Sequence, residues 1–229
     1  MKILAIDTSG QSASAAIYAD EKILAEIFVD CGLTHSQTIM PMVEEIFKKT
    51  SVSPSEIDYI ACVSGPGSFT GLRIGASTAK GLAFALNKKI IPVPALDALA
   101  YNIINNNENT VILPLMDARR GQAYTAFYGW ENEKFIKTYD YSCQNIVEII
   151  DELRLRNASV CVLGDGAAVF RETLLSSGIS CVFAPPHLNR VHASAVAVLA
   201  VKRVDEAVAC DEFELFYVRK PQAEREREL

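Results

Sequence analysis

Residues 65–75 read Gly65-Pro66-Gly67-Ser68-Phe69-Thr70-Gly71-Leu72-Arg73-Ile74-Gly75, and this is the most informative stretch of the chain. The mostly apolar residues 59–64 precede it and predict a buried strand, and residues 72–86 follow it with the pattern of a helix. A strand, a glycine-rich turn and a helix often form an anion site, because the first N–H groups of a helix lack partners within it. The glycines do not match the GxGxxG dinucleotide pattern, and no P-loop lysine follows them. The stretch therefore indicates either a ligand site or an interface.

The composition is that of an ordinary soluble globular protein. Of the 229 residues, 50% are hydrophobic and 22% are charged, and the formal net charge is −6. A chain of this length can form one large domain or two lobes. Because the chain is acidic overall, contact with RNA needs a local basic patch or a basic partner.

The N-terminus and the cysteines indicate a cytoplasmic protein with reduced thiols. The chain has six cysteines and no CxxC pair. The apolar run between Lys2 and Asp7 is too short for a signal peptide. No apolar run approaches the roughly 20 residues of a membrane helix, so we expect no membrane contact.

The order of the elements predicts an α/β fold with mixed sheets. Three strands at 3–6, 12–19 and 22–29 open the chain and are followed by a helix at about 35–49. This opening suggests the actin-like ATPase lobe, in which an antiparallel hairpin precedes the parallel strands. The polar run Asn105–Asn109 predicts a boundary between an N-terminal lobe, residues 1–104, and a C-terminal lobe, residues 105–229, with a charged tail.

Further elements are expected in the C-terminal lobe. They are strands at 111–116, 122–130, 135–141, 159–163 and 213–218, and helices at 143–155, 167–177 and 192–204.

Four segments together resemble the TsaB (YeaZ) family of bacteria. They are Ile3-Leu4-Ala5-Ile6-Asp7-Thr8-Ser9, His35-Ser36-Gln37, Gly65–Gly75 with Ala79-Lys80-Gly81, and Asp117-Ala118-Arg119-Arg120. The resemblance covers nearly the whole chain and implies the two-lobed fold of actin, sugar kinases and heat-shock ATPases.

The resemblance also implies a role in making N6-threonylcarbamoyladenosine at position 37 of tRNA. It implies a non-catalytic subunit that forms a heterodimer with TsaD, which transfers the threonylcarbamoyl group from its adenylate to tRNA. The ATPase TsaE joins this pair, tRNA is reached only through the complex, and a homodimer forms when TsaD is absent. No catalytic residue and no cofactor are expected in this chain.

Two loops are candidates for binding a nucleotide or phosphate. Asp7, Thr8 and Ser9 occupy the place where actin-like ATPases have a phosphate-binding hairpin, and Gly164, Asp165 and Gly166 follow a predicted strand. Asp7-Thr8-Ser9-Gly10 also fits a plain turn in which the Asp7 carboxylate accepts bonds from nearby backbone. Because no second metal-binding carboxylate is apparent near Asp7, the plain turn is the favoured interpretation.

A metal site is not expected. The relatives that catalyse the reaction hold a metal with histidines spaced HxxxH, which places both on one helix face. This chain has only His35, His187 and His192, and none are four residues apart.

Small residues recur at every fourth position from the glycine-rich turn through helix 72–86, namely Gly71, Gly75, Ala79 and Ala83. Such a stripe allows another helix to approach closely, and it also fits packing on the protein's own sheet. The resemblance assigns the pairing surface to helices 35–49 and 72–86. The interface candidates are therefore this stripe and, with it, His35, Ile39, Met42, Val43 and Arg73. His35 also fits a simple helix-terminal polar residue.

Arg119 and Arg120 lie at a predicted turn, where they fit either a solvated tip or a contact to tRNA or nucleotide phosphate. Two other functions compete with the tRNA-modification role. One is an ATP-dependent small-molecule kinase of the same superfamily, and the other is a homodimeric binding module.

Overall fold

The computed structural model describes residues 1–104 and 109–219, which form two compact units. The first unit contains Met1–Ala98 and Val191–Tyr217, and the second contains Leu99–Arg190 with Val218 and Arg219. The prediction that the C-terminal lobe includes residues 191–217 is therefore wrong. The physical reason is α7 (Ala193–Val201), an apolar helix that is almost wholly buried against the sheet of the first unit.

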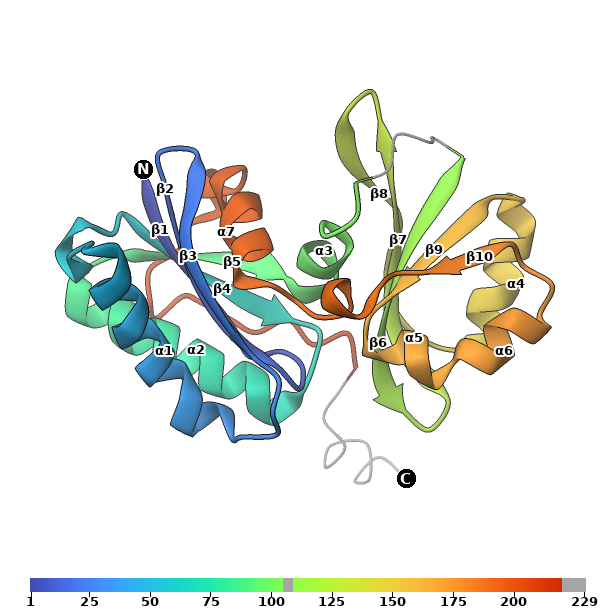
Figure 1. Ribbon diagram of the computed structural model, residues 1–229, viewed down its shortest axis with the longest axis horizontal. Coiled ribbons are helices and arrows are strands. Elements are labelled where there is room, and N and C mark those ends of the chain that lie inside the picture. The colour runs from blue at the N-terminus through green and yellow to red at the C-terminus, as the bar shows by residue number, and fades with distance from the viewer. Residues whose placement is uncertain (105–108, 220–229) are drawn as a thin grey trace. The chain divides into compact units, whose positions relative to one another are not determined.

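The first unit is built on a five-stranded mixed sheet with the order β3-β2-β1-β4-β5. β1 pairs antiparallel with β2 and parallel with β4, so a hairpin meander continues into a parallel layer. Helices α1 and α2 cover one face of this sheet and α7 covers the other (Figure 1). The elements are β1 (Lys2–Asp7), β2 (Ala13–Ala19), β3 (Lys22–Val29), α1 (His35–Thr50), η1 (Pro54–Glu56), β4 (Tyr59–Gly65), α2 (Phe69–Leu86), β5 (Lys89–Pro94) and η3 (Val204–Glu206).

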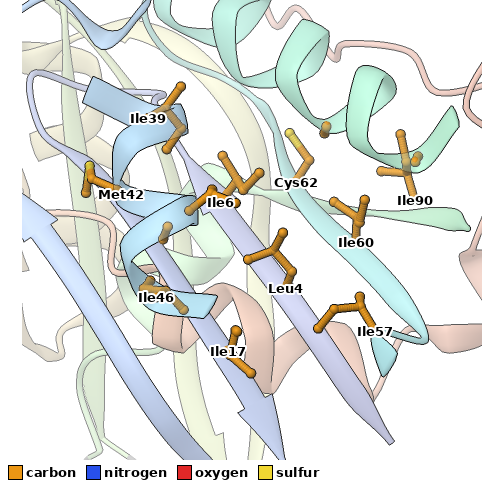
Figure 2. Close-up of a cluster of buried hydrophobic side chains, with 14 of the residues drawn as sticks. Leu4, Ile6, Ile17, Ile39, Met42, Ile46, Ile57, Ile60, Cys62 and Ile90 are labelled. Atoms are coloured by element: carbon orange, nitrogen blue, oxygen red, sulfur yellow. The ribbon is translucent and has the colours of Figure 1, made fainter. Parts of the chain in front are cut away.

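The core of the first unit lies between the sheet and helices α1 and α2. Leu4 and Ile6 of β1 alternate with residues on the opposite face, as a strand requires, and both are fully buried. Figure 2 shows Ile39, Met42 and Ile46 of α1 pointing into this cluster. The spacing of these residues places them on one side of the helix, which explains why α1 forms here.

The second unit repeats the same topology. Its sheet has the order β10-β9-β6-β7-β8, in which β6 pairs antiparallel with β7 and parallel with β9. α3 (Ala95–Ala100) spans the boundary between the units, which falls between Ala98 and Leu99. The elements that follow are β6 (Thr110–Arg119), β7 (Gln122–Glu131), β8 (Lys134–Asn145), α4 (Ile146–Arg156), β9 (Ser159–Leu163), α5 (Asp165–Val169), α6 (Arg171–Ser176), β10 (Cys181–Phe183) and η2 (Pro186–Leu188). The predicted α/β class is confirmed.

Several predicted boundaries differ from the structure. The expected helix 143–155 begins at Ile146, because Asn145 and Glu148 form a capping box there. The expected helix 167–177 is divided at Phe170 into α5 and α6. The expected strand at 213–218 is not formed, and Phe213 inserts its side chain into the core of the first unit. Most of the polar run at 105–109, and the tail from residue 220, lie outside the described residues.

Within the described parts of the chain, none of the helices has both the length and the apolar character needed to cross a membrane.

Candidate functional site

The hairpin formed by Asp7, Thr8, Ser9 and Gly10 is bound to the first turn of α2. Asp7, Thr8 and Ser9 are buried, with exposed fractions of 1%, 2% and 0%. The Thr8 hydroxyl donates to the carbonyl oxygen of Gly71 at 2.7 Å. The Ser68 N–H donates to the carbonyl oxygen of Ser9 at 2.7 Å. The hairpin therefore contacts this chain's own helix through both side-chain and backbone atoms.

Glycine is required where α2 passes the hairpin. A Cβ atom at Gly71 would lie 2.1 Å from the carbonyl oxygen of Thr8, and one at Gly75 would lie 2.5 Å from Oγ1 of Thr8. Ala79 and Ala83 continue the stripe and are buried, with exposed fractions of 0% and 1%. The prediction that this stripe forms an exposed interface is wrong, because the stripe packs on the chain's own sheet and hairpin.

Replacing Thr8 with valine tests the bond between the hairpin and α2. We expect Thr8→Val to lower the free energy of unfolding by about 1–2 kcal/mol, because the buried carbonyl of Gly71 loses a donor while the side-chain volume is kept. Thr8→Ser keeps the hydroxyl and should lower the free energy of unfolding by less than Thr8→Val does. Urea denaturation of both variants measures the difference, and equal losses for the two would contradict this role of the hydroxyl.

The Asp7 carboxylate is held inside the first unit. Its Oδ1 accepts from the Ser9 N–H at 2.9 Å, and its Oδ2 is buried without a hydrogen-bond partner. Burial raises the pKa of Asp7 to about 6, against the opposing effect of the Ser9 contacts. In residues 1–104 and 109–219, no three His, Cys, Asp or Glu side chains gather as a metal ion would need. The contacts of Asp7 are those of the plain turn, and its assignment to phosphate binding stays a prediction.

The burial of Asp7 makes stability depend on pH. Because the folded state raises this pKa above the unfolded value of about 3.9, it binds the proton more tightly than the unfolded chain does. The resulting stabilisation is complete below about pH 4 and is lost as the pH rises through about 6. Asp7→Asn should remove this dependence. The denaturation midpoints at pH 4.5 and pH 7 measure this dependence. An equal change of the midpoint between these pH values in parent and variant would exclude Asp7 as the cause.

His35 ties the start of α1 to the same hairpin. Its Nε2 lies 2.9 Å from the carbonyl oxygen of Gly10, so this nitrogen carries the proton and donates it. A hollow of about 460 Å³ lies beside His35, where the N-termini of α1 and α2 converge. The hollow is lined by Gln11, Asp30, Gly32, Leu33, Thr34, His35, Ser36, Ser68, Thr70, Gly71 and Ile74.

Three predicted interface residues of α1 face the core. Ile39, Met42 and Val43 are exposed by only 1%, 6% and 2%. Their assignment to an exposed partner surface is therefore wrong, because all three side chains belong to the core cluster. Figure 2 shows Ile39 and Met42 in this cluster. Arg73 is exposed, and its place at an interface stays a prediction, as does that of His35.

The outward surface of α1 and α2 instead contains an apolar groove of about 470 Å³. Met40 and Phe69 border it and are 45% and 39% exposed. The complete lining is Ser36, Ile39, Met40, Phe69, Thr70, Arg73, Ile74, Ser77 and Thr78. Sequence reasoning missed Met40 and Phe69. The available signal was that Met40 lies off the buried stripe of α1 and still carries a large apolar side chain.

The glycines of the Gly164-Asp165-Gly166 loop are explained by packing within the second unit. A Cβ at Gly164 would lie 2.1 Å from the carbonyl oxygen of Leu115, and one at Gly166 would lie 2.9 Å from it. Asp165 accepts from the Asp117 N–H at 3.0 Å, and burial raises the pKa of its carboxyl. The assignment of this loop to nucleotide binding stays a prediction.

Arg119 and Arg120 lie at the tight turn between β6 and β7, both with positive φ. Arg119 pairs with Asp117 at 3.2 Å, and its side chain is 79% exposed. The Arg219 guanidinium donates to the carbonyl oxygen of Ala118 at 3.0 Å, so the structure brings a third arginine to this turn. Contact of this turn with tRNA or nucleotide stays a prediction.

Known proteins similar to this chain are associated with one tRNA modification. The family described as TsaD, tRNA N6-adenosine threonylcarbamoyltransferase, matches residues 30–226. The tRNA threonylcarbamoyladenosine biosynthesis protein TsaB of Bacillus subtilis is 31% identical over 174 residues, covering 76% of this chain and 75% of that protein. TsaB of Escherichia coli is 40% identical over 128 residues, covering 56% of this chain and about half of that protein, 55%.

A solved structure supports the fold. The structure of YeaZ from Pseudomonas aeruginosa superposes with a TM-score of 0.77 at 23% sequence identity, covering 94% of this chain and 99% of that chain. The predicted two-lobed, actin-like architecture is confirmed.

Proposed function

We propose that this chain, which belongs to the TsaB (YeaZ) family of tRNA threonylcarbamoyladenosine biosynthesis proteins, is a non-catalytic subunit that docks to a TsaD transferase. In this role TsaD transfers the threonylcarbamoyl group from its adenylate to adenosine 37 of tRNA. TsaE joins the pair, and tRNA is reached only through the complex. The same role places the protein in the cytoplasm.

The groove between α1 and α2 is the observation that carries this proposal. It presents an exposed methionine, an exposed phenylalanine and an exposed arginine on the outer side of two rigid helices. Such residues are typical of the centre of protein–protein interfaces. Because the TsaD family itself matches most of this chain, the partner has a related fold. Two related chains can pair through equivalent surfaces about an approximate twofold axis, and two copies of this chain can pair in the same way.

The hairpin contacts support a non-catalytic role. In a phosphate-binding hairpin, backbone N–H groups and hydroxyls must remain free for the ligand. Here the Thr8 hydroxyl is bound to Gly71, and the Ser9 N–H is bound to the Asp7 carboxylate. Both groups are therefore occupied within the chain.

Reconstitution tests the proposal. Purified TsaD, TsaE, ATP, threonylcarbamoyl adenylate and tRNA are incubated with and without this chain, and the modified nucleoside is measured by mass spectrometry. We expect product only when this chain and TsaD are both present. Product from this chain without TsaD would overturn the non-catalytic role. Equal product without this chain would show that it is not needed.

A further inference from the structure

The end of the first unit forms a C-terminal strap, residues 207–217, that runs along β5 and α2. Val208 and Ile90 exchange two backbone hydrogen bonds of 2.9 Å at the edge of the sheet. Phe213 is 2% exposed and packs in the same core cluster as Ala79 of α2. Buried contacts of Phe213 therefore hold the strap against α2, upstream of its last residues.

The last residues of the strap are held by backbone atoms. The Phe216 N–H donates to the carbonyl oxygen of Ser64 at 2.8 Å. The carbonyl oxygen of Phe216 would lie 2.3 Å from a Cβ at Gly65, whose φ is +124°. Glycine at this position thus permits the strap to approach β4. The position of Tyr217 follows from these backbone contacts and does not require its own side chain.

Tyr217 contacts the rim of the groove between α1 and α2. Its ring centroid lies 5.6 Å from that of Phe69, with the planes tilted by 38°. The guanidinium carbon of Arg73 lies 3.8 Å from the centre of the same Phe69 ring. Phe69 and Arg73 line the groove, whereas Tyr217 lies outside its lining. The Phe69 ring is therefore in contact with the strap and with the next turn of α2.

We propose that Tyr217 is a positioning residue for docking, holding Phe69 and, through it, Arg73 in the orientation that the TsaD partner meets. This inference rests on the proposed docking through α1 and α2. Phe69 is the first residue of α2 and is 39% exposed, so few neighbours within the helix restrict its side chain. Fixing such a ring before association reduces the conformational entropy that binding would otherwise lose.

The test measures affinity for purified TsaD by calorimetry, using the full chain. We expect Tyr217→Ala to weaken binding roughly 3- to 10-fold, the range typical of an aromatic pair. Tyr217→Phe keeps the ring and should bind as the parent does. Glu214→Gln changes an exposed residue of the same strap and should also have no effect. The melting temperature is recorded for each variant, and Tyr217→Leu replaces the alanine variant if that protein unfolds.

A double-mutant cycle separates positioning from a general structural effect. If Tyr217 acts through Phe69, Tyr217→Ala should cause no further loss when Phe69 is already alanine. Parent-like binding of Tyr217→Ala would overturn the inference, as would an equal loss in both backgrounds. If a substitution at Met40 in the groove blocks docking while Tyr217→Ala does not, only the role of Tyr217 fails. If neither substitution affects docking, the proposed docking surface is wrong, and this inference fails with it.

Discussion

Replacing Gly71 with alanine is expected to lower the free energy of unfolding by about 3 kcal/mol, because the added methyl group overpacks a rigid contact. The new Cβ would lie 2.1 Å from the backbone oxygen of Thr8, so one of the two segments must move. That movement also disturbs the hydrogen bond from Thr8 to Gly71. For a chain of this length, the loss corresponds to a fall in melting temperature of roughly 6–12 °C. Differential scanning calorimetry measures it.

Gly81 provides the matched control in the same helix. It is exposed, and a Cβ there would meet no atom within 4 Å. Gly81→Ala should therefore stabilise the protein by about 0.5–1 kcal/mol, as expected for glycine in a helix interior. A destabilisation of similar size at both positions would show that the effect at Gly71 comes from the helix and not from the hairpin contact.

Replacing Met40 with aspartate is expected to weaken docking to TsaD by roughly 30-fold, equivalent to about 2 kcal/mol. Met40 is 45% exposed and borders the groove, so the substitution removes apolar contact area and places a charge where the partner would bury it. The stability of the free chain should change little, because the side chain lies outside the core. Titration calorimetry with purified TsaD measures the affinity.

Leu155→Asp is the control for Met40→Asp. Leu155 is 82% exposed on α4 of the second unit and lies outside the groove. The same exchange of an exposed apolar residue for a charge should leave affinity unchanged there. Equal affinities for parent and Met40→Asp, with both proteins folded, would exclude the groove as the docking surface.

Local sequence patterns predicted the helices and strands well where apolar residues recur with a regular period and the repeat has a clear end. The spacing of Ile39, Met42 and Ile46 predicted α1, and it also marked the side of the helix that the sheet buries. Ile39 and Met42 were nevertheless assigned to the partner surface. The core buries the apolar face of α1, so the docking surface that we propose uses a residue beside that face, Met40.

The C-terminal boundary was missed for a different reason. α7 is apolar on nearly all sides, so its sequence shows that it is buried but not which sheet covers it. Its contacts with β1 and β2 join residues more than 170 positions apart, such as Ala193 and Ser14. No local pattern carries information over that distance.

The α/β class, most of the elements and, through the motifs, the family could be predicted from the amino-acid sequence. The contacts of the small-residue stripe of α2 became known from the three-dimensional fold. Small residues allow close approach to any neighbour, so their spacing is the same for an exposed helix pair and for a buried contact. The neighbour is Thr8, which is 63 residues from Gly71 and is brought beside it by the pairing of β1 with β4. That contact turns the stripe inward, and the docking surface that we propose lies on the other side of α2, with Phe69 and Arg73.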